Sequence, residues 1–367
     1  MREGWEYKTI EKCTSIEYGT RVVQKRDGGT IYPVYGGGGE TFRMDRYNRE
    51  DCLIIARFAM SPRCVRYVAG KFFLNDSGLS VKSKEELEQA YLNYHLLFFN
   101  DVIYHLGKGA AQRNLDVKAF RQLVIAIPPK PTQLSIVSEL DKLNELIQIK
   151  KVQLKDYDAL AQSIFYEMFG DPVENEKGWE VKTFGEIGTL ERGAGISKKD
   201  FVDDGLPCIH YGQLHTIFGA YTRKTITFIP KDLLPKYKIA YPGDLILAIT
   251  SEDVEGSCKS TAWLGDYDVV VGSDAAIFHH NQNGIYLSYY TRTKAFYNEK
   301  AKYAKGFKVT HISTKEIASI SICVPPLSIQ NTFANKIEQI ERQKTIIQES
   351  ITDLETLLAS RMQYWFD

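Results

Sequence analysis

The chain has 367 residues, of which 44% are hydrophobic and 25% are charged, and its formal net charge is zero. This length suits two domains with connecting segments, and the composition is ordinary for a globular protein. The six cysteines form no Cys-x-x-Cys pair and the seven histidines add no metal-ligand spacing, so neither a disulfide framework nor a zinc site is indicated. No apolar run reaches membrane-spanning length and the N-terminal residues lack an apolar signal core, so a cytoplasmic location without membrane contact is expected.

Charge is distributed unevenly along the chain. Residues 1–127 contain 19 Lys/Arg and 15 Asp/Glu, residues 172–324 contain 18 of each, and residues 128–171 and 325–367 are each net negative by two. Neutralisation of phosphates supplies much of the energy of DNA binding. Any affinity of this chain alone for DNA is therefore expected to be modest.

The first segment, residues 1–127, is predicted to be an α+β domain. Short apolar runs at residues 51–56 and 71–74 are typical of buried strands, and residues 91–99 are predicted to form an amphipathic helix. Four consecutive glycines at residues 36–39 predict a loop. This loop either lets the backbone approach a ligand closely or is only a flexible turn, and the sequence favours neither.

A long helix is predicted over residues 128–171. Pro128 and Pro129 suit the start of a helix, where a missing N–H costs nothing. An apolar seam with alternating steps of three and four residues follows for more than four heptads, which is typical of a coiled coil. The seam positions are Ile136, Leu140, Leu143, Ile147, Lys150, Leu154, Tyr157, Ala161, Ile164 and Met168.

The second globular segment, residues 172–324, repeats the ends of the first. Gly4-Trp5-Glu6-Tyr7-Lys8-Thr9 returns 174 positions later as Gly178-Trp179-Glu180-Val181-Lys182-Thr183. The interiors, residues 34–107 and 208–304, share little identity, although runs at 244–249 and 268–271 again predict buried strands and 285–297 a helix. A duplicated scaffold with divergent interiors is expected if each domain recognises a different ligand.

The last segment, residues 325–367, repeats the long helix without a gap at an offset of 197. Pro325, Pro326 and Gln330 match Pro128, Pro129 and Gln133. Its seam positions are Phe333, Ile337, Ile340, Lys344, Ile347, Ile351, Leu354, Leu358, Arg361 and Trp365. The two seams are predicted to pair as an antiparallel coiled coil related by a pseudo-twofold axis, the alternative being that each helix packs onto its own domain. Lys150 and Lys344, one in each seam, are expected to point outward or to meet carboxylates of another subunit.

Catalytic signatures are weak. Gly193-Ala194-Gly195 is a lone glycine pair, and no Walker A run is present. Glu6-Tyr7-Lys8 and Glu180-Val181-Lys182 have the Glu-x-Lys spacing of metal-dependent nucleases, but the adjacent tryptophans favour strands that anchor the domain edge. No catalytic residue, metal ligand or cofactor is therefore predicted in this chain.

Basic, amide and aromatic side chains in predicted loops are the candidates for DNA contact. Arg, Asn, Gln and Lys can read base edges, whereas Lys, Tyr and backbone N–H groups hold phosphates. The candidates are Lys25, Arg26, Tyr35, Arg43, Arg57, Arg63, Lys108, Arg113 and Asn114 in the first segment, and Lys198, Lys199, His210, Tyr211, Gln213, Arg223, Lys224, Lys259, Lys305, Lys308 and His311 in the second. For any one of these residues, a solvated surface charge is the simpler interpretation. The case for DNA contact depends on basic residues that recur at matched positions of the two segments, such as Lys108 and Lys305.

The fourfold order of domain, helix, domain and helix resembles the specificity subunit of a Type I restriction–modification system. The motifs that carry the resemblance are the Gly-Trp-Glu-x-Lys-Thr opening of each half, the Pro-Pro-x-x-x-Gln entry to each helix, and the strand Gly243-Asp244-Leu245-Ile246-Leu247. The first half departs from this strand motif, having Arg49-Glu50-Asp51-Cys52-Leu53 instead.

The resemblance implies two target recognition domains, residues 1–127 and 172–324, each reading one half of a split, asymmetric site in double-stranded DNA. It implies that the helices 128–171 and 325–367 pair through residues such as Leu140, Leu143, Ile147, Leu154, Ile337, Ile340, Ile347 and Leu354, set the spacing and dock two modification subunits. S-adenosylmethionine is then expected on those subunits, and ATP with Mg²⁺ on restriction subunits that translocate DNA. This chain would have no active site.

Two other classes of function remain open from the sequence. One is a self-sufficient nuclease or methyltransferase that uses both globular segments, which activity of the purified chain alone would support. The other is a scaffold whose paired domains bind proteins or glycans, against which salt-dependent DNA binding would count.

Overall fold

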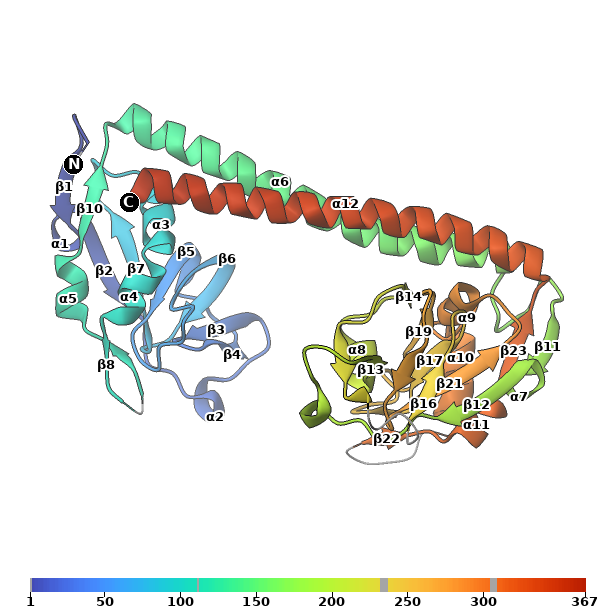
Figure 1. Cartoon of the computed structure of the whole chain (residues 1–367). Helices are drawn as coiled ribbons and strands as arrows, with labels where there is room; N and C mark the ends of the chain where they lie inside the picture. The colour runs from blue at the N-terminus through green and yellow to red at the C-terminus, as the bar shows by residue number, and fades with distance from the viewer. Residues whose placement is uncertain (1, 111, 232–236, 304–308) are drawn as a thin grey trace. The chain divides into compact units, whose positions relative to one another are not determined.

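The computed structural model describes residues 2–110, 112–231, 237–303 and 309–367. By its internal contacts the chain divides into two units: unit 1, which comprises residues 1–152 and 348–367, and unit 2, which comprises residues 153–347. Each unit therefore combines one globular segment with one half of each long helix (Figure 1).

The two long helices are α6 (Lys130–Phe169) and α12 (Leu327–Phe366), each of 40 residues. They begin directly after the proline pairs, because the carbonyl of Pro129 accepts the N–H of Thr132 at 2.8 Å and that of Pro326 accepts the N–H of Ile329 at 2.9 Å. Gly170, with a positive φ of 74°, ends α6 by donating its N–H to the carbonyl of Tyr166 at 2.8 Å. The helices thus lie within the spans that the heptad pattern predicts.

Every predicted seam position is buried or half-buried. Leu140, Ile147, Ile337 and Ile340 are buried, and Leu143, Leu154, Ile347 and Leu354 are half-buried. The period of 3.5 residues therefore identified the inward face of both helices correctly.

Within each unit the two helix segments run antiparallel. In unit 1, Glu139 near the start of α6 pairs with Arg361 near the end of α12, and Lys151 pairs with Glu355 at 2.8 Å. In unit 2, rings near the end of α6 pack against Phe333 near the start of α12, with a centroid distance of 5.6 Å for Phe165.

Unit 1 contains, among its described residues, a six-stranded sheet and two short antiparallel strand pairs. The sheet has the order β2-β7-β5-β6-β3-β4, formed by β2 (Thr14–Tyr18), β3 (Tyr32–Gly36), β4 (Gly39–Met44), β5 (Arg49–Ala56), β6 (Val65–Leu74) and β7 (Gly78–Ser83). The pairs are β1 (Glu6–Thr9) with β10 (Val124–Ile127), and β8 (Gly107–Lys108) with β9 (Asn114–Leu115). The helices are α1 (Ile10–Cys13), α2 (Gln24–Asp27), α3 (Gln89–Phe98), α4 (Asn100–His105) and α5 (Val117–Gln122).

Unit 2 contains, among its described residues, a five-stranded and a four-stranded sheet. The first has the order β12-β21-β17-β19-β14, formed by β12 (Gly188–Arg192), β14 (Tyr221–Thr222), β17 (Leu245–Ala248), β19 (Ser260–Trp263) and β21 (Ala275–His280). The second has the order β15-β13-β20-β16, formed by β13 (Leu206–Ile209), β15 (Thr227–Ile229), β16 (Lys238–Ala240) and β20 (Val269–Val271). Two further pairs are β11 (Glu180–Thr183) with β23 (Ser321–Val324), and β18 (Thr250–Ser251) with β22 (Thr310–His311). The helices are α7 (Phe184–Ile187), η1 (Lys198–Asp200), α8 (Tyr211–Thr216), α9 (Gly284–Tyr290), α10 (Lys294–Ala301) and α11 (Thr314–Ala318).

A central strand of each unit is buried on both faces. In β5, Leu53 and Ile55 face the core that includes α3 and the long helices, whereas Ile54 faces the opposite core. In β17, Leu245 and Leu247 face the core that includes Phe165 and Phe333, and Ile246 faces the other. Alternation of side chains along a strand explains why both segments read as continuous apolar runs.

The repeated ends of the two globular segments form the same structure. In β1–β10, Glu6 lies opposite Ile127, and in β11–β23, Glu180 lies opposite Val324. A four-residue helix and another strand follow in both units, namely α1 and β2 in unit 1, and α7 and β12 in unit 2. The divergent interiors form different sheets, as their lack of sequence identity indicates.

Two local predictions need correction. Residues 285–297 form two helices, because α9 ends before Thr291 and the side chain of Thr293 caps α10 by accepting the N–H of Phe296 at 3.3 Å. The four glycines are not all loop, since Gly36 and Gly39 pair as the last residues of the β3–β4 hairpin and only the two glycines between them form the turn.

Lys344 also differs from the expectation. Its Nζ pairs with Asp158 Oδ1 at 2.7 Å and with Glu341 Oε1 at 2.9 Å, so its carboxylate partners belong to this chain. Both acids lie on the long helices, one on each.

Candidate nucleic-acid interface

Four separate segments of unit 1 are joined into one surface, which we call the unit 1 loop cluster: the turn 36–39, residues 57–64, residues 75–77 and the β8–β9 hairpin. Hydrogen bonds from backbone N–H groups join them. The N–H of Arg57 donates to Ser77 O at 2.7 Å, and the N–H of Gly37 donates to Ser77 Oγ at 2.8 Å. The carbonyl of Arg57 accepts the N–H of Leu115 at 2.9 Å, which attaches the hairpin.

Gly37 permits the closest approach in this cluster. A Cβ at this position would lie 2.0 Å from the carbonyl oxygen of Phe58, whereas one at Gly38 would meet nothing within 4 Å. The first of these two glycines is therefore required by packing within the chain, which is a different reason from both the ligand approach and the flexible turn considered from the sequence.

Five of the predicted contact residues lie in the unit 1 loop cluster: Arg57, Arg63, Lys108, Arg113 and Asn114. The guanidinium of Arg57 lies 4.4 Å from the ring centroid of Phe58, and that of Arg113 lies 4.6 Å from the ring of Tyr104. Asn114 Oδ1 accepts the N–H of Ala59 at 3.2 Å. The aromatic rings and the backbone therefore hold the side chains of Arg57, Arg113 and Asn114 in place.

The other unit 1 candidates lie outside the loop cluster. Lys25 and Arg26 are on α2, where Arg26 pairs with Asp27 at 3.0 Å. Arg43 donates to the carbonyl of Ile31 at 3.0 Å, and Tyr35 packs edge-on against Phe72 at a ring distance of 5.5 Å. Figure 1 shows α2 and the β8–β9 hairpin at the end of unit 1 that points away from the long helices.

In unit 2, three candidates, Tyr211, Lys259 and His311, lie together with His215 around a second polar surface. Lys259 Nζ donates to the carbonyl of His215 at 2.7 Å, and the ring of His215 bonds to the carbonyl of Thr250 at 3.2 Å. Thr250 Oγ1 lies 3.3 Å from His311 Nδ1. A cavity of about 730 Å³ opens beside them. Its lining includes Tyr211, His215 and Thr250, together with the acidic residues Glu252, Asp253 and Glu255.

His210 and Gln213 serve the fold of α8, a role that the sequence analysis did not assign. Gln213 Oε1 accepts the N–H of His210 at 2.8 Å, and its amide donates to Thr227 Oγ1 at 3.0 Å. His210 Nδ1 in turn accepts the N–H of Gly212 at 3.2 Å. Both side chains are buried, and burial lowers the pKa of His210.

Arg223 lies on the helix side of unit 2. Its guanidinium pairs with Glu338 of α12 at 2.9 Å and donates to the carbonyl of Leu264 at 3.2 Å. Lys224 follows it directly, while Lys198 and Lys199 are exposed on η1. Lys305 and Lys308 lie outside the described residues.

The Glu-x-Lys pairs form ion pairs along their own strands. Glu6 and Lys8 lie 2.7 Å apart on β1, and Glu180 and Lys182 lie 3.2 Å apart on β11. In the part of the chain that the structure describes, no group of three or more His, Cys, Asp or Glu side chains is arranged to hold a metal ion. No described helix combines the length and the apolar character needed to cross a membrane.

Some residues that build these surfaces escaped the sequence analysis. Ser77 joins two segments of the unit 1 loop cluster, and Thr250 does the same in unit 2. Small hydroxyl side chains give no charge or periodicity signal. Only the folded positions of their neighbours reveal them.

Comparison with known proteins connects these surfaces to a family. The model of the Type I restriction modification DNA specificity domain matches residues 3–156 and, a second time, residues 176–356. The chain belongs to this family. The resemblance drawn from the repeated motifs is confirmed, and the chain is a specificity subunit with two target recognition domains.

Relatives within the specificity family are similar over most of their length. The MjaVIII specificity subunit of Methanocaldococcus jannaschii is 24% identical over 299 residues, which are 74% of this chain and 70% of that one. A putative type I restriction enzyme specificity subunit of Haemophilus influenzae is 22% identical over 362 residues, 94% of this chain and 90% of its own.

Solved structures share the fold. The specificity subunit from M. genitalium has a TM-score of 0.57 at 14% identity, covering 99% of this chain and 96% of that one. A chain from a study of the assembly and conformational transition of the type I restriction–modification system has a TM-score of 0.58 at 17% identity, covering 99% and 97%.

Proposed function

We propose that each recognition domain reads one half of a bipartite, asymmetric DNA site. The observation that carries this proposal is that both units use the same frame, with β1–β10 matching β11–β23, yet present different loops on different sheets. Two different readers in one chain specify a site whose halves differ.

The two long helices are proposed to pair as one antiparallel coiled coil that sets the distance between the half-sites. The antiparallel contacts within each unit and the inward orientation of both seams support this. Readers on one side of the duplex must be about 34–36 Å apart, or a multiple of it, to face the same groove.

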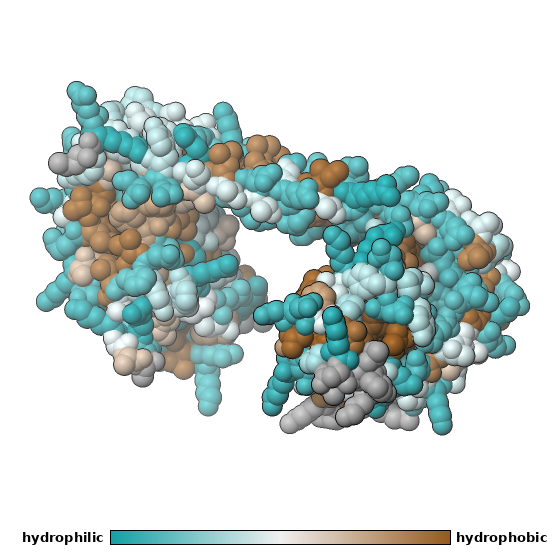
Figure 2. All heavy atoms as spheres, in the orientation of Figure 1, coloured by the Kyte–Doolittle hydropathy of each residue, from teal (hydrophilic) through white to brown (hydrophobic). Residues whose placement is uncertain are grey.

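The outward faces of the helices are proposed to dock two modification subunits. Apolar side chains are exposed there, and Figure 2 shows hydrophobic atoms on the surface of the helical part. The exposed apolar residues of the two helices include Leu146, Ile149, Val152, Leu160, Ile346 and Leu357. Exposed apolar residues at such density are typical of a surface that a partner covers.

Catalysis is proposed to lie entirely outside this chain. S-adenosylmethionine would bind to the modification subunits, and ATP with Mg²⁺ to restriction subunits, as the family resemblance implies. The Glu-x-Lys side chains, paired with one another along their strands, support a structural role for those motifs.

Methylation mapping tests the proposal. The chain is co-expressed with the modification subunits of its own system, and the host DNA is sequenced for modified adenine. We expect one split, asymmetric motif, and exchange of residues 1–127 for those of a relative is expected to change one half only. A stable complex that adds no methylation would overturn DNA recognition by these domains.

The role of the helices in spacing needs a separate test. Residues 143–149 and 352–358, one heptad from each helix within unit 1, are deleted together so that the seam stays in register. The deletion is expected to change the length of the unread gap and to leave both half-site sequences unaltered. An unchanged gap in a folded, active variant would contradict the spacing role.

A further inference from the structure

Gln133 and Gln330 occupy the same place in the two Pro-Pro-x-x-x-Gln motifs, and both side chains are completely buried, at 1% and 0% exposure. A buried amide is costly unless its donors and acceptor are all paired. The partners of these two amides therefore show what the motif does.

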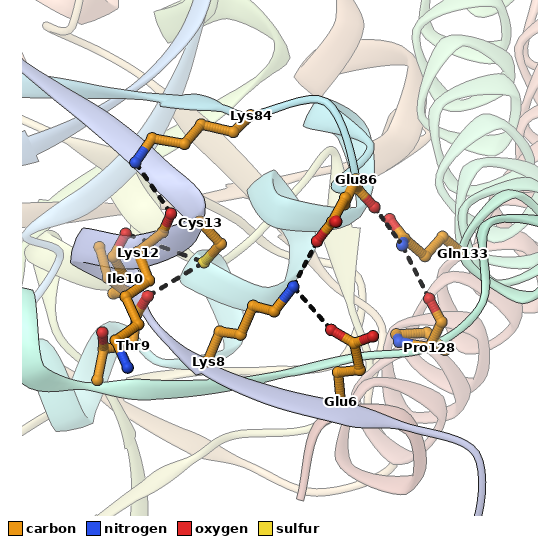
Figure 3. A network of polar contacts seen from close by, with 10 residues as sticks. All are labelled: Glu6, Lys8, Thr9, Ile10, Lys12, Cys13, Lys84, Glu86, Pro128 and Gln133. Carbon is orange, nitrogen blue, oxygen red and sulfur yellow. Dashed lines mark hydrogen bonds and ion pairs between the residues drawn. The ribbon is translucent and has the colours of Figure 1, made fainter.

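In unit 1, Gln133 joins the start of α6 to the start of α3. Its Oε1 accepts the backbone N–H of Glu88, the N-cap residue of α3, at 2.8 Å. Its Nε2 donates to the carbonyls of Pro128 at 2.9 Å and Glu86 at 3.0 Å. Figure 3 shows Gln133 between these two segments, with the side chain of Glu86 turned toward Lys8.

In unit 2, Gln330 makes the same connections between α12 and α9. Its Oε1 accepts the backbone N–H of Asn283, the N-cap residue of α9, at 3.0 Å. Its Nε2 donates to the carbonyl of Pro325 and to Gln282 Oε1, both at 2.8 Å. We call this arrangement of glutamine amide, proline carbonyl and N-cap N–H the glutamine clamp.

The chemistry of the glutamine clamp suits glutamine in particular. The second proline of each pair, Pro129 or Pro326, already accepts the first N–H groups of the long helix. The carbonyl of the first proline, Pro128 or Pro325, is therefore available to a side-chain donor. The backbone N–H of the N-cap residue of α3 or α9 needs an acceptor. A primary amide supplies both at the end of one side chain, whereas a carboxylate lacks the donors and a methionine lacks both.

A second matched contact reinforces the glutamine clamp. Tyr91, three residues after Glu88, donates its hydroxyl to the carbonyl of Ala126 at 2.8 Å. Tyr286, three residues after Asn283, donates to the carbonyl of Cys323 at 2.6 Å. In both units the acceptor lies two residues before the first proline, so α3 and α9 are each fixed at two points to the chain that enters the long helix.

We propose that Gln133 and Gln330 are positioning residues that set the orientation of each recognition domain on its long helix. The glutamine clamp would thereby determine where each reader meets its half-site relative to the helices. This inference rests on the proposed function, since an orientation matters to recognition only if the domains read DNA.

Amide exchange tests the glutamine clamp without DNA. In the full chain, Gln133→Met and Gln330→Met remove donor and acceptor at similar side-chain size, and the exposed Gln148→Met and Gln339→Met are matched controls. Hydrogen–deuterium exchange at Glu88 in the first variant, and at Asn283 in the second, is expected to become roughly tenfold faster or more, with no change in the controls. Unchanged exchange would overturn the clamp. If a methionine variant fails to fold, Gln133→Glu or Gln330→Glu replaces it, because glutamate keeps the acceptor and loses the donors. Faster exchange is then expected at the backbone N–H groups that follow the proline pair.

Gap-length selectivity then tests the positioning role. The same variants are co-expressed with the modification subunits in cells carrying sites whose unread gap differs by one base pair. We expect Gln330→Met to modify sites with altered gaps while the half-site sequences stay the same. If the glutamine has only a structural role, modification at sites with the native gap will fall and sites with other gap lengths will stay unmodified. This result would overturn the positioning role even if amide exchange is faster. If the proposed function is wrong, the wild-type chain will modify none of the sites, which distinguishes this outcome from the others. The positioning role would then be wrong as well. The hydrogen-bonding role of the glutamine clamp would still be tested by the exchange experiment alone.

Discussion

Lys344 of α12 forms an ion pair with Asp158 of α6, with Nζ and Oδ1 2.7 Å apart, whereas its counterpart in the repeat, Ile147, is a buried apolar residue. The same seam position is therefore polar in unit 2 and apolar in unit 1. The partly exposed lysine also contacts Glu341 and lines a cavity of about 390 Å³ together with Tyr289 and Arg292.

Exchange of residues between these matched positions should be asymmetric. Lys344→Ile is expected to change the free energy of unfolding by less than about 1 kcal/mol, because replacing a partly exposed ion pair by an apolar side chain is often neutral. Ile147→Lys is expected to destabilise by an amount on the order of 3 kcal/mol, because it buries an unpaired charge. Urea denaturation of both variants measures this, and equal effects would contradict the assignment.

Glu139 should give unit 1 a pH-dependent stability. The hydrogen bond from Arg361 holds the pKa of Glu139 below its ordinary value of 4.5, and Trp365 Nε1 donates to the same carboxylate at 3.0 Å. A lowered pKa in the folded state stabilises above the unfolded value, and this stability is lost as the pH falls through the folded value. Since the side chains are about one-third exposed, the wild type should exceed Glu139→Gln in stability by at most about 1 kcal/mol near pH 7. The two stabilities should converge as the pH falls from 4.5 through the lowered folded pKa. A difference that persists in acid would mean that the carboxylate charge is irrelevant.

His95 should add a second pH dependence with a different window. Burial lowers its pKa to about 4, and its ring lies against Phe99 and Phe366 at centroid distances of 4.5 and 4.9 Å. The folded state keeps this ring neutral while the unfolded state binds a proton below about pH 6.5. Stability should therefore fall by up to about 3 kcal/mol as the pH drops from 6.5 to 4.

Thermal unfolding across this pH range tests the assignment to His95. His95→Phe should reduce the slope, whereas His105→Gln, a change at an exposed position, should leave it intact. Part of the slope should remain in the first variant, because burial also lowers the pKa of His280 to about 4. An unaltered slope in His95→Phe would contradict the prediction.

Arg113 and Arg223 should differ in their effect on DNA binding. Arg113 belongs to the unit 1 loop cluster, whereas Arg223 is paired with Glu338 of α12. In the complex with modification subunits, Arg113→Ala should weaken binding by about 1–3 kcal/mol or lower the salt slope by about 1. Arg223→Ala should leave both unchanged. Fluorescence anisotropy at several salt concentrations measures the two quantities, and a larger loss for Arg223→Ala would reverse the assignment of the surfaces.

Gly37 and Gly38 should respond differently to the same substitution. Gly37→Ala places a Cβ 2.0 Å from the Phe58 carbonyl oxygen, so the unit 1 loop cluster must shift, at a cost of about 1–3 kcal/mol. Gly38→Ala meets nothing within 4 Å and should be close to neutral. Denaturation curves and methylation of the unit 1 half-site compare the pair, and equal behaviour would exclude close packing as the reason for the glycine.

Local patterns determined the architecture of this chain. The heptad period identified both long helices and their inward faces, the proline pairs marked where they start, and the Gly-Trp-Glu-x-Lys-Thr repeat marked the matching strands β1 and β11. Each of these signals consists of residues a few positions apart, so it can be recognised in the sequence without knowledge of the tertiary structure. The helix predicted over residues 285–297 was wrong in one respect, because the N-cap signal of Thr293 in its middle was not used.

The tertiary structure alone decided which side chains meet. Gly37, Arg57 and Ser77 come from separate connections and are joined only because β3, β5 and β7 belong to one sheet. Residue type suggested DNA contact for His210 and Gln213, yet the fold uses both side chains in capping α8. Contacts between distant residues depend on strand order and on loops that differ between the two units, so neither the period nor the internal repeat carries that information.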